Sequence, residues 1–337
     1  MDFLEKLQTA IRDELAFVLY RKPSESLIWL LVQDDSGENE FLMHSFDSKI
    51  EKSISDKQPT QISLNNFNFN YDLKLNTIRE FNSISEKKYQ ELVQNTIDEI
   101  SKTQLSKVVI SRIKVENNSS FQVLLSFKKL VQNHPDALVY LWHTPKETWM
   151  GATPELLLQE NKAEIQTVSL AGTKLPEYDW TEKEFDEQKI VTNYITSELQ
   201  GLMNLKIKGP ETIQAGSFQH LKSYISADIP QRFSIKKLVR KLHPTPAVCG
   251  LPKNSAFHFI LENEGYNRNF YTGFIGIKNK SNTDYFVNLR CTQLFQNQIW
   301  IYVGGGITAE SVPEKEWIET ELKSETILNS MIQNPKL

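Results

Sequence analysis

IYVGGGITAESVPEKEWIETELK, residues 301–323, is the stretch around which the rest of the chain can be interpreted. Its opening residues Ile301–Val303 predict a strand, and the glycines at 304–306 predict a turn directly after it. Ser311 and Glu314 then match the capping-box pattern at the start of a charged helix. The stretch therefore predicts a strand, a glycine turn and a helix in succession.

Three charged residues of that helix share one face. At 100° per residue, Glu316, Glu319 and Lys323 fall within about 60° of one another. Carboxylates just beyond a glycine turn are suited to a hard cation, and a lysine beside them is suited to an acid group of a ligand. From this stretch alone a second interpretation stays open, namely a glycine hairpin end followed by a solvated Glu–Lys pair.

Composition indicates an ordinary globular protein. The chain has 337 residues, of which 39% are hydrophobic and 24% charged, and its net charge of −4 argues against a nucleic-acid groove. Cys249 and Cys291 show no metal-ligand spacing and no disulfide framework, which fits a reducing compartment. The acidic N-terminus does not resemble a signal peptide, and the early apolar run Leu27–Val32 is far too short to span a bilayer. We therefore expect a cytoplasmic protein.

Two ionisable residues stand beside apolar stretches. Lys107 opens KVVISRIKV, a predicted strand in which alternate residues face opposite sides. Glu155 lies at a turn in WMGATPELLL, directly before three leucines. Desolvation would lower the pKa of the lysine towards that of a general base and raise the pKa of the glutamate towards that of a proton donor. The alternative for each is a residue that points into water.

A predicted helix over about residues 181–202 contains the most informative local pattern. On a helical wheel Glu184 and Glu187 fall inside the apolar stripe that Ile190 and Val191 begin. A carboxylate that faces inward needs a cation or a proton, and two of them one turn apart suggest a metal with a supporting partner. The alternative is that the first turn overhangs the core and both acids reach water.

Three further segments are candidates for binding. SLAGT at 169–173 ends in a Gly-Thr turn that offers an N–H and a hydroxyl to an anion. HPTPAVCGLP at 243–252 is too rich in proline for a regular element, which predicts a rigid loop walling a pocket. In the predicted strand 285–293, Arg290 faces the side opposite Leu289, as a fork for a carboxylate or as a surface residue.

Taken together and in order, these motifs resemble those of the chorismate-utilising enzymes: isochorismate synthases, salicylate synthases and the large subunits of anthranilate and aminodeoxychorismate synthases. The similarity runs from Lys107 to Lys323, about two thirds of the chain. Its motifs are KVVISR, GATPELLL, LAGT, the helix of Glu187, HLKS, HPTPAVCGLP, NFYTGFIG, LR and GGGI…EWIET..K. The first hundred residues carry no motif of the family.

The resemblance implies an α+β fold with two packed antiparallel β-sheets flanked by helices, as in anthranilate synthase component I. It implies one chorismate-binding domain over 1–337, with a divergent N-terminal part at 1–100 and a catalytic core at 101–330. The site is expected in a cleft between the sheets, with Mg2+ as cofactor.

The resemblance also assigns roles residue by residue. Lys107 matches the base and Glu155 the acid. Glu187 and Glu319 match the metal ligands, with Glu184 and Glu316 behind them, and we expect Glu187 and Glu319 to meet across the cleft, away from bulk solvent. The remaining matches are to substrate contacts, with the enolpyruvyl carboxylate on Arg290 and Lys323: Gly172, Thr173, His220, Ala247, Tyr271, Arg290, Gly304, Gly306 and Lys323.

The choice within the family depends on Ala247. Aminating members and salicylate synthases resemble one another in carrying threonine there, whereas HPTPA is similar to isochorismate synthases. The resemblance therefore implies an isomerase that adds water at C2 of chorismate and removes the hydroxyl from C4, for menaquinone or a siderophore. It implies a monomer without an amidotransferase subunit, a nucleic acid or a membrane as partner.

Two alternatives stay open: another chorismate enzyme, either salicylate-forming or aminating, and a binding protein that kept the fold. One departure from the family is Gln188, where many members carry histidine after the glutamate.

Overall fold

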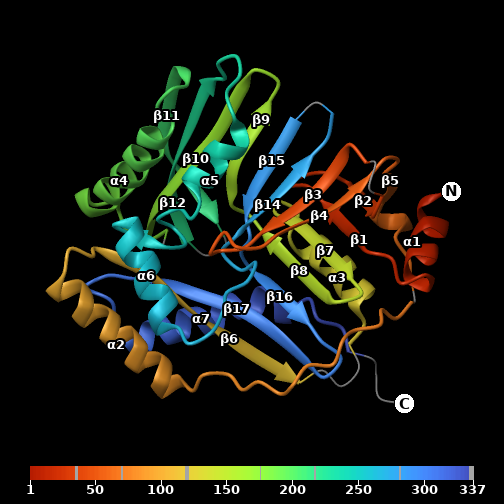
Figure 1. The fold of residues 1–337 in the computed structure, drawn as a ribbon. Coiled ribbons are helices and arrows are strands. Elements are labelled where there is room, and N and C mark those ends of the chain that lie inside the picture. Colours follow the sequence, from red (N-terminus) through yellow and green to blue (C-terminus); the bar gives the residue numbers. More distant parts are fainter. Residues whose placement is uncertain are drawn as a thin grey trace.

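The computed structural model describes residues 1–34, 37–69, 71–117, 121–174, 176–215, 218–280 and 282–333 (Figure 1). In these ranges the chain forms two large antiparallel sheets with helices on their outer faces. The expected α+β architecture of two antiparallel sheets with flanking helices is confirmed.

One sheet, called sheet A, has nine strands within the described residues. In spatial order they are β13 (Gly250–Leu251), β6 (Lys107–Asn117), β17 (Gln298–Ile307), β16 (Cys291–Leu294), β8 (Glu147–Thr153), β7 (Leu138–Thr144), β1 (Phe17–Arg21), β2 (Leu27–Val32) and β5 (Thr60–Ser63). Every pairing in it is antiparallel.

The other sheet, called sheet B, has eight strands among the described residues. Their order is β11 (Met203–Ala215), β12 (Phe218–Asp228), β10 (Glu164–Lys174), β9 (Leu156–Asn161), β15 (Asn282–Val287), β14 (Phe274–Lys278), β3 (Asn39–His44) and β4 (Glu51–Asp56). The N-terminal strands join both sheets, because β1, β2 and β5 belong to sheet A whereas β3 and β4 belong to sheet B.

Apolar side chains from the two sheets pack together between them. Tyr140 and Trp142 of sheet A share one buried cluster with Phe41, Ile275 and Phe286 of sheet B. Alternation along each strand sends every second side chain into this layer, and the remainder face the helices. The shared cluster therefore packs the two sheets against each other.

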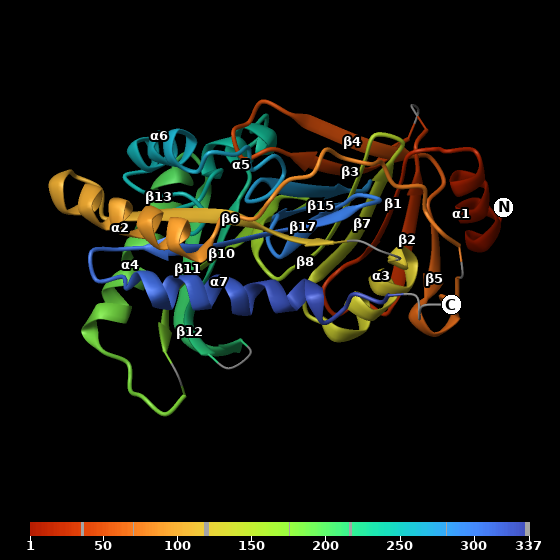
Figure 2. The same cartoon turned by 90° about the horizontal axis from the view of Figure 1, so that it is seen from below.

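Helices cover the outer faces. They are α1 (Phe3–Arg12), α2 (Glu86–Lys102), α3 (Val123–Asn133), α4 (Glu182–Glu198), α5 (Ile235–Leu242), α6 (Lys253–Asn263) and α7 (Pro313–Leu328), with a short 3-10 turn at Leu64–Asn66. Helices α4 and α5 pack on sheet B, and α1, α3 and α7 pack on sheet A. Figure 2 shows α7 running along sheet A, with α4 beyond its N-terminal end. None of the helices in the described ranges is both long and apolar enough to cross a membrane.

The N-terminal helix is shorter than its pattern predicts. The apolar spacing over residues 1–20 predicts one helix, but α1 ends at Arg12 and β1 begins at Phe17. Phe17, Val18 and Leu19 are all fully buried, between the two layers that flank sheet A. A strand that is buried on both faces has apolar residues at successive positions, with no alternation of apolar and polar ones. Such residues also fit the apolar spacing of a helix, by chance.

Candidate active site

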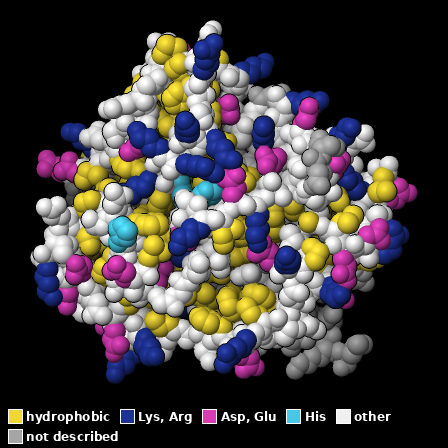
Figure 3. All heavy atoms as spheres, in the orientation of Figure 1, with side chains coloured by type: hydrophobic (Ala, Val, Ile, Leu, Met, Phe, Trp, Pro, Cys, Tyr) yellow, Lys and Arg dark blue, Asp and Glu magenta, His cyan; other side chains and the backbone are white. Residues whose placement is uncertain are grey.

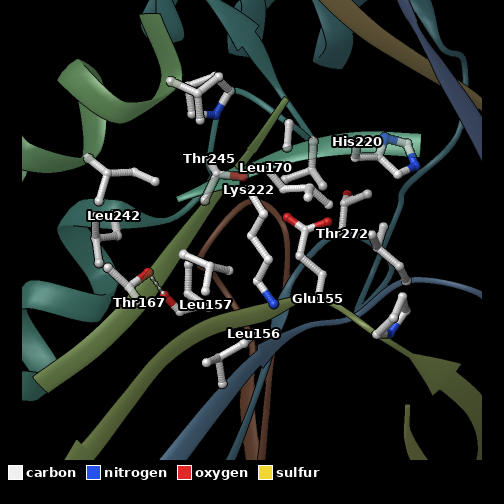
Figure 4. A pocket seen from close by; sticks show the side chains of 18 of the residues that line it. Glu155, Leu156, Leu157, Thr167, Leu170, His220, Lys222, Leu242, Thr245 and Thr272 are labelled. Atoms are coloured by element: carbon white, nitrogen blue, oxygen red, sulfur yellow. Dashed lines mark hydrogen bonds between the residues drawn. The ribbon is translucent and has the colours of Figure 1, made fainter. Parts of the chain in front are cut away.

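A cavity of about 820 Å3 lies where β10, β11 and β12 of sheet B extend beside β17 of sheet A. Its lining includes Glu155, His220, Tyr271, Arg290 and Lys323, together with the glycines at 304–306 and the loop residues at 245–248. The close-up in Figure 4 shows Glu155, Lys222 and Thr245 among its walls. Most of the residues assigned to substrate by resemblance therefore gather in one cavity.

The three glycines are part of a strand, so the predicted turn is wrong. Strand β17 continues to Ile307 and pairs with β6, with Gly304 opposite Ser111 and Gly306 opposite Val109. A β-carbon on Gly306 would lie 2.7 Å from Cε of Lys107, and one on Gly305 would lie 2.9 Å from Oε2 of Glu316. The glycines are needed because their missing side chains leave room for catalytic candidates on the neighbouring elements.

We expect Gly306→Ala to remove most activity while leaving the fold intact. The added methyl group meets the flexible end of Lys107 and not backbone, so the lysine side chain moves and the strand does not. The expected result is a kcat lowered by about 100-fold, the size of a displaced acid or base, with a melting temperature near that of the wild type. A Gly306→Ala enzyme with wild-type kcat would show that the position of Lys107 is unimportant.

Lys107 is half-buried at the start of β6, and the end of its side chain lies beside Gly306, which lines the cavity together with Val109. Burial lowers the pKa of its amine, and Lys323 lowers it further, whereas Glu187, Glu155 and Glu319 raise it. Coulombic effects of this kind fall off over a few ångströms in a protein. The four other charged groups therefore converge on the amine of Lys107 from three places in the fold, namely α4, the junction of β8 and β9, and α7.

Glu155 lies directly after β8, and its backbone fixes it between two sheets. Its N–H donates to Oγ1 of Thr153 at 3.4 Å, and its carbonyl accepts from the N–H of Val287 at 2.9 Å. Burial raises the pKa of its carboxyl group to about 7, against the opposing charges of Lys107 and Arg290. At neutral pH a large fraction of Glu155 is therefore protonated and can donate a proton.

Arg290 lies at a break in the predicted strand 285–293. Strand β15 ends at Val287 in sheet B and β16 begins at Cys291 in sheet A, so the chain changes sheets at residues 288–290. Arg290 has a φ of 46°, a left-handed conformation that turns the chain and is held by a hydrogen bond from the N–H of Ala152 to the Arg290 carbonyl at 3.1 Å. Its guanidinium lines the cavity and interacts with the charge of Glu155.

The predicted common face of Glu316, Glu319 and Lys323 on α7 is confirmed, but the predicted capping box at the start of this helix is not. Val312 is the N-cap and makes no side-chain cap bond, while the hydroxyl of Ser311 donates to Oε1 of Glu316 at 2.8 Å. Nζ of Lys323 donates to the carbonyl of Gly304 at 2.9 Å and lies 2.5 Å from Oε1 of Glu319. Glu316, Glu319 and Lys323 thus all reach the glycine strand.

The inward face of α4 differs from the prediction. Gln188 is buried, and its Nε2 donates to the Ser169 and Ser223 hydroxyls at 2.9 and 3.0 Å, whereas Glu187 is exposed. The inward line runs through buried residues 188, 195 and 199 and half-buried residue 191. Ile190, which made the pattern point towards Glu187, is 52% exposed. Glu187 nevertheless lies near the amine of Lys107, whose pKa it raises.

The other predicted metal-site residues are also placed differently from expectation. Glu319 is 50% exposed, so neither it nor Glu187 is sheltered from solvent, contrary to expectation. Glu184 is half-buried, and its carboxylate accepts from the N–H of Thr181 at 2.9 Å as part of a capping box. In the part of the chain that is described, no group of three or more His, Cys, Asp or Glu side chains is assembled for a metal ion. The metal-binding roles stay predictions.

Of the remaining predicted substrate contacts, His220, Ala247 and Tyr271 line the cavity, whereas Gly172 is not among its lining residues. Nδ1 of His220 is 3.3 Å from the carbonyl oxygen of Gly172, and burial lowers the pKa of this histidine. Gly172 has a φ of 71° and packs against the backbone of Glu184, which fixes the end of β10 under α4. Ala247 lines the cavity, and Tyr271 is buried behind Gly304. Of Thr173 only the backbone is described, so the role of its side chain lies outside the described residues.

Sequence analysis missed a buried ion pair that joins the walls of this cavity. Nε of Arg268 donates to Oε2 of Glu264 at 2.8 Å, and Oε1 of Glu264 accepts from the N–H of Ser111 at 2.6 Å. The guanidinium also donates to the carbonyls of Val248 at 3.0 Å and Val109 at 2.6 Å. The spacing of four residues between Glu264 and Arg268 could have indicated an ion pair, but oppositely charged residues at this spacing are usually solvated.

Comparison with known proteins gives a family and a fold for this chain. The family model of the chorismate binding enzymes matches residues 39–332. Isochorismate synthase DhbC of Bacillus subtilis (strain 168) is 27% identical over 267 residues, covering 72% of this chain and 67% of that protein. The chain spans about two thirds of the length of the curated relatives it matches.

Solved structures share the fold. MenF, the menaquinone-specific isochorismate synthase from Escherichia coli, superposes with a TM-score of 0.78 at 18% identity, covering 94% of this chain and 88% of that chain. Anthranilate synthase component I from Streptococcus pneumoniae TIGR4 gives a TM-score of 0.74 at 16% identity, covering 93% and 92%. Because the family model matches most of the chain and the fold is the same, this chain belongs to the chorismate binding enzyme family.

Proposed function

We propose that this protein is an isochorismate synthase, which isomerises chorismate to isochorismate by adding water at C2 and removing the hydroxyl group from C4. The observation that carries the proposal is the pair Lys107 and Glu155. Burial shifts their pKa values in opposite directions, down for the amine and up to about 7 for the carboxyl group. Opposite shifts of this kind favour the amine as the proton acceptor and the carboxyl group as the proton donor.

Each side chain has a separate task in the proposed reaction. The amine of Lys107 takes a proton from the water that attacks C2, while Glu155 protonates the hydroxyl that leaves C4, because hydroxide is a poor leaving group. Arg290 and Lys323 hold the enolpyruvyl carboxylate, and both line the cavity. The small apolar side chain of Ala247 lies beside the attacked carbon. His220 positions the ring.

Mg2+ is the proposed cofactor, bound by Glu187 and Glu319 with Glu184 and Glu316 behind them. The donors on α7 fit such an ion, because Oε2 of Glu316 is buried with no hydrogen-bond partner among the described residues and faces Gly305. Carboxylate oxygens are the ligands that Mg2+ prefers. When bound, the ion supplies positive charge that restrains the ring carboxylate and offsets developing negative charge.

The experiment that tests the function is incubation with chorismate and Mg2+, followed by chromatographic identification of the product. Isochorismate as the sole product is the expected result. Salicylate with pyruvate would identify a lyase, and anthranilate formed with ammonia would identify an aminating enzyme. Either outcome, or unchanged chorismate, would overturn the proposal. Menaquinone biosynthesis is the proposed destination of the product, with a siderophore as the alternative.

Glu187→Ala and Glu319→Ala are each expected to weaken Mg2+ binding at least tenfold, because each removes one charged oxygen ligand from a site with few of them. Titration calorimetry with Mg2+ alone measures this without turnover. Glu314→Ala is the matched control, since Glu314 is exposed on the first turn of the same helix as Glu319. Equal affinity in Glu319→Ala and the control would remove Glu319 from the metal site.

The rate should fall as the pH rises through about 7, because Glu155 acts only while protonated and its pKa is about 7. Arg290 lowers this pKa, so removal of its charge in Arg290→Gln should shift the alkaline fall of kcat to higher pH. The measurement is a pH–rate profile of both enzymes. A fall at the same pH in both would assign it to a group other than Glu155.

A further inference from the structure

The cavity has a charge opposite to that of the whole chain. The chain has a net charge of −4. Of the described residues that line the cavity, the basic ones are Lys206, Lys208, Lys222, Arg290 and Lys323, and the acidic one is Glu155. Figure 3 shows both acidic and basic side chains on one face of the molecule. The proposed reaction uses Arg290 and Lys323, which leaves three lysines without a role.

Those three lysines share one surface of sheet B. In the strand register Lys222 is opposite Leu170, and Tyr224 is opposite both Val168 and Lys208. Directly opposed residues point to the same face of a sheet, and so do Lys206 and Lys208, which are two residues apart. The reverse face carries α4 on the buried side chains of Ile165 and Ile225. Val168, Leu170 and Tyr224 with the three lysines therefore form a floor of the cavity.

Two of the lysines are available to a ligand. Neither Lys206 nor Lys222 forms an ion pair with a carboxylate of the described residues, whereas Lys208 lies 3.0 Å from Glu211 at the surface. Lys222 is half-buried, and its Nζ lies 4.8 Å from the centre of the Tyr224 ring. Figure 4 shows its side chain extending into the cavity from β12.

The floor is distinct from the catalytic end of the cavity. The lysines of the floor lie on β11 and β12 of sheet B, whereas Lys107 lies on β6 of sheet A and Glu155 follows β8 of the same sheet. The cavity volume of about 820 Å3 lies in the upper part of the range of small-molecule sites. A substrate with a single six-membered ring fills only part of it, so the floor is free while the catalytic end is occupied.

We propose that Lys206 and Lys222 recruit the dicarboxylate substrate to this floor before it reaches Lys107 and Glu155. The occupant is a small dianion with an unsaturated ring: its carboxylates are attracted by the two ammonium groups, and its ring lies on Leu170, Val168 and Tyr224. A cleft lined by charges of one sign raises the local concentration of the opposite ion and its rate of capture. The inference rests on the proposed function, because it takes the substrate to be chorismate.

The test is the ionic-strength dependence of kcat/KM. The double variant Lys206→Gln with Lys222→Gln should lower kcat/KM about 10-fold at low salt, at the lower end of steering effects, with kcat unchanged. In about 0.5 M salt the loss should shrink to within twofold, because the Debye length falls below about 5 Å. Lys206→Arg with Lys222→Arg should restore kcat/KM at low salt, since the charge is kept.

Lys146→Gln is the matched control, because Lys146 is exposed in the turn between β7 and β8 and its loss changes the net charge by the same amount per residue. Unchanged kcat/KM in the double glutamine variant would overturn the proposal, as would a loss that persists in high salt or a loss confined to kcat. Failure of the proposed function is recognised separately, because the wild type would then not convert chorismate. In that case calorimetry with chorismate tests the floor, and equal affinities of wild type and double variant would overturn it.

Discussion

Lys107→Ala and Glu155→Gln are each expected to lower kcat by about 10²- to 10⁴-fold, the range that a positioned acid or base contributes. The alanine removes the amine that is proposed to take the proton, and the glutamine keeps the size of Glu155 but cannot donate an acidic proton. Glu155 lines the cavity and the end of the Lys107 side chain lies beside Gly306 in its wall, so the folded structure should persist. Steady-state assays with chorismate measure the change in kcat.

Two matched controls separate chemistry from charge. Glu160→Gln is the control for Glu155→Gln, because Glu160 lies on β9 and lines a different pocket. Lys102→Ala is the control for Lys107→Ala, because Lys102 lies at the exposed end of α2. Both should retain wild-type kcat. Circular dichroism and the melting temperature check that the four variants are folded. A Lys107→Ala or Glu155→Gln enzyme within threefold of the wild-type kcat would remove that residue from the mechanism.

Arg268→Met is expected to destabilise the protein by about 3–5 kcal/mol, the cost of leaving one member of a buried ion pair without its partner. The side chains of Glu264 and Arg268 are 1% and 2% exposed, so water cannot replace the lost guanidinium. The carbonyls of Val109 and Val248 lose their donor at the same time. Equilibrium unfolding in urea measures the change in the free energy of unfolding.

The control for this substitution is Lys236→Met, since Lys236 is 60% exposed in its pair with Glu51 and should cost less than about 1 kcal/mol. The double variant Glu264→Gln with Arg268→Met should be more stable than the sum of the two single losses predicts, because it leaves no unpaired buried charge. Additive losses, or a cost for Arg268→Met as small as for Lys236→Met, would contradict the assignment of a buried, coupled pair.

Alternation in β6 shows which features the sequence predicts well. The pattern of KVVISRIKV places Lys107 and Val109 on one side and Arg112 on the other. In the structure Val109 lines the cavity, while Arg112 lies 3.9 Å from the ring centre of Trp317 on α7. A period of two is fixed by the backbone of an extended strand, so it holds in any tertiary setting.

Helix α4 shows where such patterns fail. Gln188 lies on its buried face, where its side chain donates hydrogen bonds to two serine hydroxyls of sheet B. The predicted face included Glu187 because Ile190 was expected to be buried, but Ile190 is exposed. Hydrophobicity identifies a buried face only when apolar residues alone occupy it. A polar side chain that finds its partners across a tertiary contact cannot be recognised in advance.

The amino-acid sequence by itself determined the order of the motifs, the alternation of the strands and the residue types that a chorismate-binding site requires. The tertiary structure alone decided that the glycines at 304–306 continue a strand, that Arg290 turns the chain between two sheets, and that three lysines of β11 and β12 line one cavity. The physical reason is the distance along the chain between the residues that set each feature. Strand period and helix spacing are set by neighbouring residues, whereas the space beside a glycine, the pKa of a carboxyl group and the walls of a cavity depend on segments far away in the chain.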